Sequence, residues 1–283
     1  MAVKSKGNFV FKIVAYTFLI VLLIIIVFPF LCAFTASFKG MSEVLVSPNI
    51  LPKEWKLDGY IQAWKSANFA KYTWNSVWYS ALTVFISVMT SSMNGFAFAR
   101  GEFRGKSTIF ALFTALMFIV LGTSTMYPTL QILKLLHLNQ SLWGLIVKAF
   151  FGINVANMYL VRGFVNSLPK ELDEAAEIDG CSFIRTFFSV YLPIMKPIIA
   201  TVAIFSFGAA WNDYLMPMIV TISNPDQRTL AVGLATLKSS SDAAACWNVI
   251  MAGAMISAIP MLIVYIFFNR YFISGLAAGA VKG

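Results

Sequence analysis

The stretch SLPKELDEAAEIDGCSFIRTFFSVYLPIMKP, residues 167–197, decides how this chain is organised. It is a polar, helix-forming loop that separates two apolar runs. Each of those runs reaches the roughly 20 residues that a helix needs to cross the hydrocarbon core of a bilayer. The stretch therefore predicts a loop at a membrane surface, between two membrane-spanning helices.

A short acidic helix is predicted in the first half of this loop. Ser167 can cap it through its hydroxyl, and Pro169 fits a first turn because the missing N–H needs no partner there. The acidic side chains that follow lie near the positive end of the helix dipole. Gly180 can end this helix at low steric cost.

A second short helix is predicted after it. Ser182 can cap this helix, and Phe183 and Phe187 share one of its faces because they are four residues apart. The alternative is an ordinary amphipathic loop lying on the bilayer, but such helices are rich in basic residues. The first half of this loop is acidic, so the pattern favours a protein partner over a lipid surface.

The composition is that of an integral membrane protein. Of the 283 residues, 59% are hydrophobic and 12% are charged, whereas a soluble domain carries about 25% charged residues. The net charge of +9 comes without an aromatic-interleaved basic patch, so it indicates membrane topology and not nucleic-acid binding. Cys32, Cys181 and Cys246 and the single His137 lack the spacing of a disulfide framework or a metal site. We therefore expect no metal and no cofactor.

Six apolar runs are long enough to be membrane-spanning helices. They lie at about 12–38, 74–99, 108–133, 142–164, 197–221 and 247–269. The first run could be interpreted as a signal peptide, but its apolar part at 13–34 is longer than the ~7–15 residues of a signal sequence. The sequence therefore predicts one all-α integral membrane domain over 1–283 with six transmembrane helices.

Lysine and arginine residues give the orientation, because they are more frequent in short cytoplasmic loops. They gather before the first run, at 100–106, in the 167–197 loop and after the sixth run. The outer loop at 39–73 is an exception with five lysines, partly balanced by three acidic residues. Both termini and the 167–197 loop are thus predicted to be cytoplasmic.

A longer spacing pattern runs through the loop. It consists of Glu174-Ala175-Ala176, Gly180, Val190, Leu192 and Pro193. This pattern resembles the cytoplasmic EAA loop of ABC-importer permeases, with Val190 in place of the usual isoleucine and Cys181 where a small residue is usual. Further stretches, including AFARGEFRGK at 97–106 and AAWNDYLMP at 209–217, extend the resemblance over nearly the whole chain. The chain resembles the membrane subunits of maltose-type carbohydrate ABC importers, specifically the six-span partner of a heteromeric pair.

The resemblance implies a type I ABC importer permease fold with cytoplasmic coupling helices, in the cytoplasmic (inner) membrane of a bacterium. The implied partners are a second permease subunit, two ABC ATPase subunits and an extracytoplasmic solute-binding protein that delivers a carbohydrate. The outer segment at 222–246 matches the position of a family segment that contacts the binding protein. The residues implied to couple the loop to the ATPase are Glu174, Ala175, Ala176, Asp179, Gly180, Phe183 and Phe187. Among them, Glu174 is the expected anchor for a basic residue of the ATPase.

Polar residues inside the predicted spans are costly and usually face a cavity or a partner helix. Aromatic, amide and carboxylate side chains suit a path for a sugar. The candidates for this path are Trp211, Asn212, Asp213, Tyr214, Tyr127, Lys148 and Asn154. The alternative is that these groups bond across helices, or that Lys148 reaches outward to the interface. If Lys148 faces a cavity, it would suit an anionic saccharide, such as one containing uronic acid.

No catalytic pattern is present in the sequence. The chain lacks a G-x-x-x-x-G-K-[ST] phosphate-binding loop, and one histidine with few carboxylates provides no nucleophile–base–acid set. We therefore expect a non-catalytic subunit that is driven by ATP hydrolysis elsewhere. Two alternatives stay open, namely an ABC permease for another solute such as glycerol-3-phosphate and a secondary transporter. The lack of an internal repeat argues against the secondary transporter.

Overall fold

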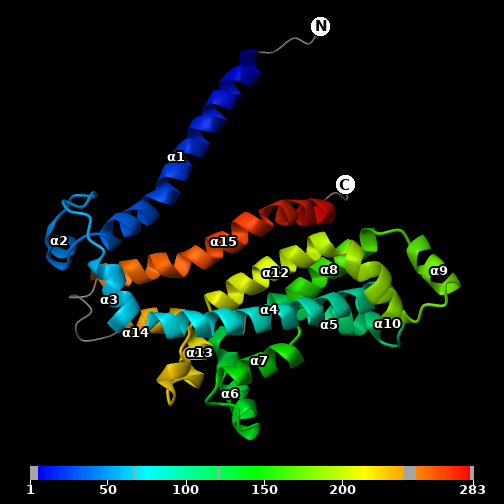
Figure 1. The fold of residues 1–283 in the computed structure, drawn as a ribbon. Helices are drawn as coiled ribbons and strands as arrows, with labels where there is room; N and C mark the ends of the chain where they lie inside the picture. Colours follow the sequence, from blue (N-terminus) through cyan, green and yellow to red (C-terminus); the bar gives the residue numbers. More distant parts are fainter. Residues whose placement is uncertain (1–5, 67, 120–121, 239–246, 281–283) are drawn as a thin grey trace. The chain divides into compact units, whose positions relative to one another are not determined.

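The computed structural model describes residues 6–66, 68–119, 122–238 and 247–280, and each regular element in that part of the chain is a helix (Figure 1). The chain divides into two compact units. The first consists of Met1–Phe69 and Leu234–Ala258, and the second of Ala70–Gly233 and Ile259–Gly283. The expectation of an all-α chain is confirmed.

The helices that lie wholly in the first unit are α1 (Lys6–Ser37), α2 (Met41–Val46) and α3 (Asp58–Ser66). Three helices have residues in both units, namely α4 (Phe69–Arg100), α14 (Leu230–Lys238) and α15 (Trp247–Ala280). Those wholly in the second unit are α5 (Lys106–Phe118), η1 (Gly122–Thr125), α6 (Met126–Leu135), α7 (Leu142–Phe151), α8 (Val155–Ser167), α9 (Glu171–Ile178), α10 (Phe183–Thr186), η2 (Phe187–Tyr191), α11 (Leu192–Ile194), α12 (Lys196–Trp211), α13 (Leu215–Val220) and η3 (Pro225–Gln227). Of these, η1 and η3 are short 3-10 helices and η2 is a single π-helical turn.

Three helices are long and apolar enough to cross a membrane without a break. They are Phe11–Ser37 in α1, Phe69–Arg100, which is α4, and Trp247–Asn269 in α15. Two further candidates are bent pairs, Leu142–Phe151 with Val155–Ser167 at 40° and Phe183–Ile194 with Lys196–Trp211 at 83°. The described residues therefore contain three to five candidate spans, where the sequence predicted six.

The prediction of one continuous helix at 108–133 is wrong. Its described residues form α5, the short η1 and α6 instead of one helix. The hydroxyl of Thr125 donates to the carbonyl of Gly122 at 3.2 Å, and such local bonds compete with a regular helix. Pro128 is the third residue of α6, where its missing N–H favours the start of a helix over continuation from the previous one.

The predicted spans at 142–164 and 197–221 are interrupted for related reasons. The first breaks at Gly152, and the Asn154 side chain then caps α8 by accepting the N–H of Asn157 at 3.0 Å. The second breaks after Trp211, and Pro217 is the third residue of α13. A proline there cannot donate to the carbonyl four residues earlier, so α12 does not run on through it.

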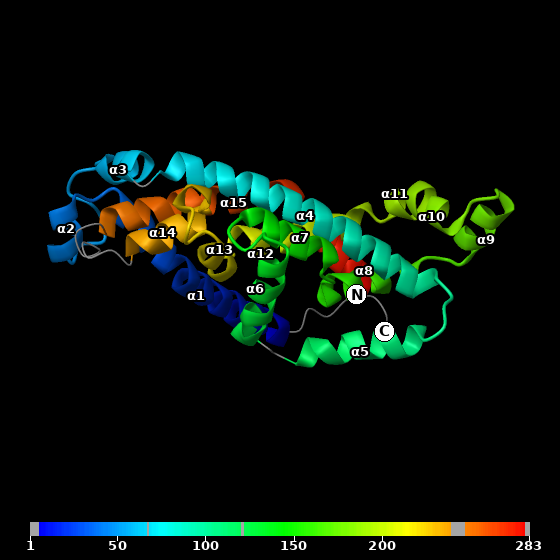
Figure 2. The same ribbon diagram turned by 90° about the horizontal axis from the view of Figure 1, so that it is seen from below.

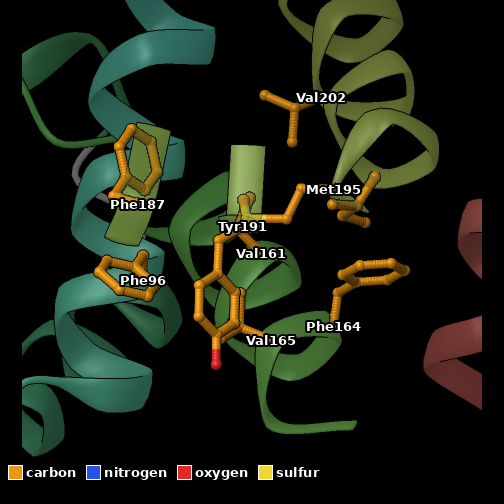
Figure 3. Close-up of a cluster of buried hydrophobic side chains, with 9 residues drawn as sticks. Phe96, Val161, Phe164, Val165, Phe187, Tyr191, Met195 and Val202 are labelled. Atoms are coloured by element: carbon orange, nitrogen blue, oxygen red, sulfur yellow. The ribbon is translucent and has the colours of Figure 1, made fainter. Parts of the chain in front are cut away.

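The second unit is held together by two apolar clusters. One joins α4, α8, η2 and α12, and Figure 3 shows its side chains facing one another. Its buried members are Phe96, Val161, Phe164, Val165, Phe187, Tyr191, Met195, Ile198 and Val202. The other cluster joins α4 and α6 to α7, α12 and α13 through Tyr79, Leu133, Leu142, Leu145, Ile146, Ala210, Met216 and Val220. Within this unit, α9 and α10 lie together at the end of α4, as both ribbon views show (Figures 1 and 2).

Helices α4 and α8 approach each other very closely at Gly95. A Cβ atom added there would lie 2.5 Å from Cγ1 of Val161, a distance that real Cβ contacts essentially never show. Small residues allow this kind of close packing between helices in a membrane. Gly95 therefore fixes how tightly these two helices pack.

Candidate functional site

The 167–197 loop contains the two short helices that the sequence predicts, with one correction at its start. Ser167 is the last residue of α8, and its hydroxyl donates to the carbonyl of Phe164 at 2.6 Å. Ser167 is therefore not the cap of α9, and Pro169 is not in its first turn, because α9 begins after Lys170. Leu168 precedes Pro169 and is extended, with ψ 147°, as the clash with a following proline favours. That extended residue separates α8 from α9.

The turn that ends α9 is as the sequence predicts. Gly180 has a φ of +70°, and its N–H donates to the carbonyl of Glu177 at 2.9 Å. The N–H of Cys181 donates to the carbonyl of Ala176, also at 2.9 Å. These two bonds form a Schellman motif, in which glycine is favoured because it adopts a positive φ without strain.

The side chains expected to couple the loop divide into exposed and buried groups. Glu174 and Ala175 are exposed on α9, and Asp179 and Gly180 are exposed in the turn that follows it. The carboxylate of Glu174 makes no ion pair or hydrogen bond among the described residues. Ala176 is buried instead, so it packs α9 against the rest of the unit. The exposed face of α9 is thus acidic and free to meet a partner.

The two phenylalanines of the second helix differ in their surroundings. Ser182 caps α10 as predicted, by accepting the N–H of Arg185 at 3.4 Å. Phe187 is 2% exposed and belongs to the apolar cluster of Figure 3. Phe183 is 48% exposed, with its ring centroid 4.7 Å from that of Phe96. Phe183 is therefore available to a partner, whereas Phe187 is a core residue.

Arg100 at the end of α4 was missed by the sequence reasoning as a site residue, and it binds three parts of the loop. Its Nε lies 3.1 Å from Oδ2 of Asp173 in α9 and donates to the Tyr191 hydroxyl in η2 at 3.0 Å. Another guanidinium nitrogen donates to the carbonyls of Leu168 at 2.7 Å, Val165 at 3.2 Å and Pro169 at 3.3 Å. The available signals were its positions in the basic stretch at 100–106 and in the family-like stretch at 97–106.

Tyr191 completes this group. Figure 3 shows that its ring lies in the apolar cluster and that its hydroxyl points to the edge. The hydroxyl donates to Oδ1 of Asp173 at 2.6 Å. The phenol is therefore a donor to the carboxylate and an acceptor for Arg100.

A polar cavity of about 340 Å³ lies farther along the same unit. Three of the seven residues predicted for a sugar path line it, namely Lys148, Asn154 and Asp213. Its remaining walls come from residues that the sequence reasoning did not select. They include Tyr79, Thr83, Ser87 and Thr90 of α4, and Ser206, Ala209 and Ala210 of α12. The spacing of the four α4 residues by three or four positions puts them on one helix face, a signal that could have been used.

The other four residues predicted for the sugar path are not among the lining residues of this cavity. Trp211 is buried and stacks on Phe207, with ring centroids 5.4 Å apart. Asn212 donates its side-chain amide to the carbonyl of Gly208 at 2.9 Å. Tyr214 is the residue before α13, and Tyr127 is 70% exposed on α6. Of these, Trp211 and Asn212 have local structural roles.

Hydrogen bonds connect the cavity walls. The Tyr79 hydroxyl donates to Oδ2 of Asp213 at 3.4 Å. Ser206 lies 2.8 Å from the Ser87 hydroxyl and accepts from the Asn157 amide at 3.1 Å. The walls thus present hydroxyl and amide groups with one carboxylate and one ammonium group. Such a set can bind a ligand with many hydroxyls, and the described residues hold no group of three His, Cys, Asp or Glu side chains for a metal.

Part of the outer segment at 222–246 is anchored to α4. The Asn75 amide donates to the carbonyls of Asp226 at 2.8 Å and Arg228 at 3.0 Å. Lys71 forms an exposed ion pair with Asp226 at 2.9 Å. Residues 239–246, with Cys246, lie outside the described residues.

Comparison with known proteins identifies the family. The family model described as "Binding-protein-dependent transport system inner membrane component" matches residues 106–277. The chain belongs to this family. The resemblance found in the sequence is thereby confirmed, and membership places the chain in the inner membrane as one component of a multi-component transport system.

Two individual relatives are named as transport system permease proteins. The chain is 36% identical over 264 residues to the arabinooligosaccharides transport system permease protein AraQ of Halalkalibacterium halodurans, covering 92% of each chain. It is 32% identical over 272 residues to the galactooligosaccharides transport system permease protein GanQ of Bacillus subtilis, covering 95% of each. The fold matches a chain in the crystal structure of a bacterial ABC transporter involved in the import of the acidic polysaccharide alginate. That match has a TM-score of 0.81 at 22% identity and covers 96% of this chain and 100% of the other.

Proposed function

We propose that this protein is the permease subunit of a binding-protein-dependent ABC importer and that it forms half of the path for an oligosaccharide. The observation that carries this proposal is the exposed α9. Its Glu174 carboxylate has no partner within the described residues, and the Schellman motif at Gly180 fixes the turn that follows it. An acidic helix held in this way suits a basic groove on another protein.

The proposed assembly contains a second permease subunit, two ATPase subunits and an extracytoplasmic binding protein. The chain then acts as a single membrane domain over 1–283 with six spans, three of them interrupted, and with both termini in the cytosol. The charge distribution supports this orientation, since it puts the 167–197 loop on the side where ATP is available. The subunit itself has no catalytic role, and ATP is hydrolysed by its partners.

The polar cavity is the proposed site of sugar passage. Lys148 lines this cavity, and its ammonium group there would suit an anionic saccharide. Asp213 lines it as well, so the walls offer both signs of charge. A neutral oligosaccharide can bind through the hydroxyl and amide groups alone. We therefore take oligosaccharides as the substrate class and uronate-containing ones as the variant that Lys148 favours.

The test is purification of the complex with its binding protein, followed by reconstitution in liposomes. Binding protein loaded with a neutral oligosaccharide, a uronate-containing oligosaccharide or glycerol-3-phosphate is then added outside. We expect one of the oligosaccharides to stimulate ATP hydrolysis and to enter the liposomes. Stimulation only by glycerol-3-phosphate would contradict the sugar assignment, and uptake without an ATPase would identify a secondary transporter.

A further inference from the structure

Arg100 occupies a position that the proposed function does not by itself explain. We infer that Arg100 is a positioning residue that fastens the coupling helix α9 to the ends of α4 and α8, so that the three move as one body during transport. This inference rests on the proposed function, because it concerns how movement of the loop reaches the transport path.

The contacts of Arg100 suit an arginine. Its side chain is 8% exposed, and its Nε and one terminal nitrogen contact five acceptor groups in α8, α9, η2 and the segment between α8 and α9. The planar guanidinium carries five N–H donors in a fixed fork, whereas a lysine ammonium is a compact point charge. A buried charge is also stable only when it is paired, and Asp173 provides the opposite charge at 3.1 Å.

The contacts of Arg100 attach α9 to the unit, which the apolar packing does only to a small extent. Helices α4 and α8 already pack through Phe96 and Val161, and η2 packs on the same cluster through Phe187. Helix α9, which carries Glu174, has few buried side chains, with Ala176 buried and Leu172 partly buried. The bond from Asp173 to Arg100 is the polar link that carries force from α9 to α4. Loss of Arg100 should therefore leave the helices packed but loosen α9.

Helix α4 lines the polar cavity with Tyr79, Thr83, Ser87 and Thr90, and Asn154, the residue that caps α8, lines it as well. One movement of α9 would thus displace two walls together. Helix α12 forms another wall and meets the preceding helical segment at an 83° bend. The proposed mechanical path therefore runs from Glu174 through Arg100 to α4 and α8.

The experiment compares Arg100→Gln, Asp173→Asn and wild type in the reconstituted complex, with Arg162→Gln as the matched control. Arg162 is a neighbouring arginine on α8 that donates to the carbonyl of Phe98 at 3.2 Å and lies 3.9 Å from the ring centroid of Phe110. We expect the sugar transported per ATP hydrolysed to fall at least about tenfold in both test variants, which corresponds to ~1.4 kcal/mol of coupling free energy. The control should keep the wild-type ratio.

A distance measurement separates positioning from a general loss of structure. In a background without the native cysteines, spin labels are attached to cysteines that replace Ile178 on α9 and Met93 on α4, both of which are exposed. Addition of ATP should leave the distance between the labels unchanged in wild type. In Arg100→Gln the distance distribution should broaden or shift.

Several results would overturn the inference. An unchanged transport ratio and an unchanged label distance in Arg100→Gln would do so. If that variant does not assemble, Asp173→Asn decides, because its amide keeps the shape and an acceptor for Tyr191 while removing the charge; a wild-type ratio then refutes the inference. A wild-type complex that transports no sugar from any loaded binding protein contradicts the proposed function itself, and the inference falls with it.

Discussion

The 167–197 loop and the polar cavity belong to the same unit, but they differ in how fully their polar groups are bonded within the chain. In the loop, two nitrogens of Arg100 contact five acceptor groups, and the Tyr191 hydroxyl donates to Asp173. In the cavity, Lys148 forms no ion pair within 4 Å among the described residues, and Asp213 accepts a long bond of 3.4 Å from Tyr79. Paired groups hold a structure rigid, whereas groups with spare capacity can bind a ligand.

This difference distinguishes a segment that transmits movement from a surface that binds a ligand. A segment that transmits movement must keep its shape, so the groups that join its parts, Arg100, Asp173 and Tyr191, are bonded to one another, while Glu174 stays exposed for a partner. A sugar path must exchange bonds with a passing ligand, so its polar groups keep donors and acceptors free. The following substitutions test each half of the comparison.

The largest effect is expected from Glu174→Lys. It reverses the exposed charge on α9 that is proposed to meet a basic residue of the ATPase. Breaking or reversing one partner of a charge pair at an interface costs ~2–5 kcal/mol, so sugar uptake should fall about 30-fold or more. Uptake of radiolabelled sugar into cells measures this, with membrane insertion checked by immunoblot.

The control for that substitution is Glu177→Lys, which makes the same charge change at another exposed position of α9. It should reduce uptake much less than Glu174→Lys. Equal losses in the two variants would mean that the net charge of α9 matters and that Glu174 is no specific anchor.

The next largest effect is expected from Gly95→Leu, which tests the packing of α4 against α8. The added Cβ would lie 2.5 Å from Cγ1 of Val161, so α4 and α8 must separate. Overpacking of this kind costs ~1–3 kcal/mol, and the thermal unfolding temperature of the detergent-solubilised complex should fall. Gly163→Leu on α8 is the control, because a Cβ there meets no atom within 4 Å. An unchanged unfolding temperature for Gly95→Leu would refute the close packing.

A smaller effect is expected from Gly180→Ala. The φ of +70° at this position costs an L residue ~1–2 kcal/mol, so the turn after α9 should loosen. The membrane helices should keep their stability, while uptake falls about tenfold if most of that free energy is lost from coupling. Hydrogen exchange of the 171–181 backbone measures the loosening. Unchanged protection there would show that the Schellman motif does not limit the loop.

The smallest effect should come from Lys148→Gln in the cavity. Loss of the ammonium should raise the apparent KM for a uronate-containing oligosaccharide by a few fold, since a partly solvated charge interaction is worth ~1 kcal/mol. The KM for a neutral oligosaccharide of the same length should change little. The ratio of the two KM values is the measurement, and an unchanged ratio would remove Lys148 from the substrate path.

The local features of the loop could be predicted because their causes are close in sequence. The positive φ at Gly180 and the capping of α10 by Ser182 each depend on bonds within five residues of the chain. The cap at Ser167 failed for an equally local reason, since Pro169 makes Leu168 extended and moves the start of α9 to a later residue. That restriction can be seen in the sequence, because Pro169 directly follows Leu168.

The partners of Arg100 and most of the cavity walls could not be predicted in this way. Arg100 meets Asp173 across 73 positions of the chain, and Tyr79 meets Asp213 across 134. The breaks in the 108–133, 142–164 and 197–221 spans have local signals in Pro128, Gly152 and Pro217, but hydropathy does not detect them, because it measures how apolar a segment is and not whether its backbone stays helical.

Composition and the spacing around Glu174 are enough to recognise a helical membrane protein of the binding-protein-dependent permease family, because neither depends on a long-range contact. The contacts of Arg100 with α8 and α9, the burial of Phe187 beside an exposed Phe183, and the cavity shared by Lys148, Asn154 and Asp213 are visible only in the folded chain. Bonds between distant residues depend on how helices pack, and close approaches such as the one at Gly95 set that arrangement.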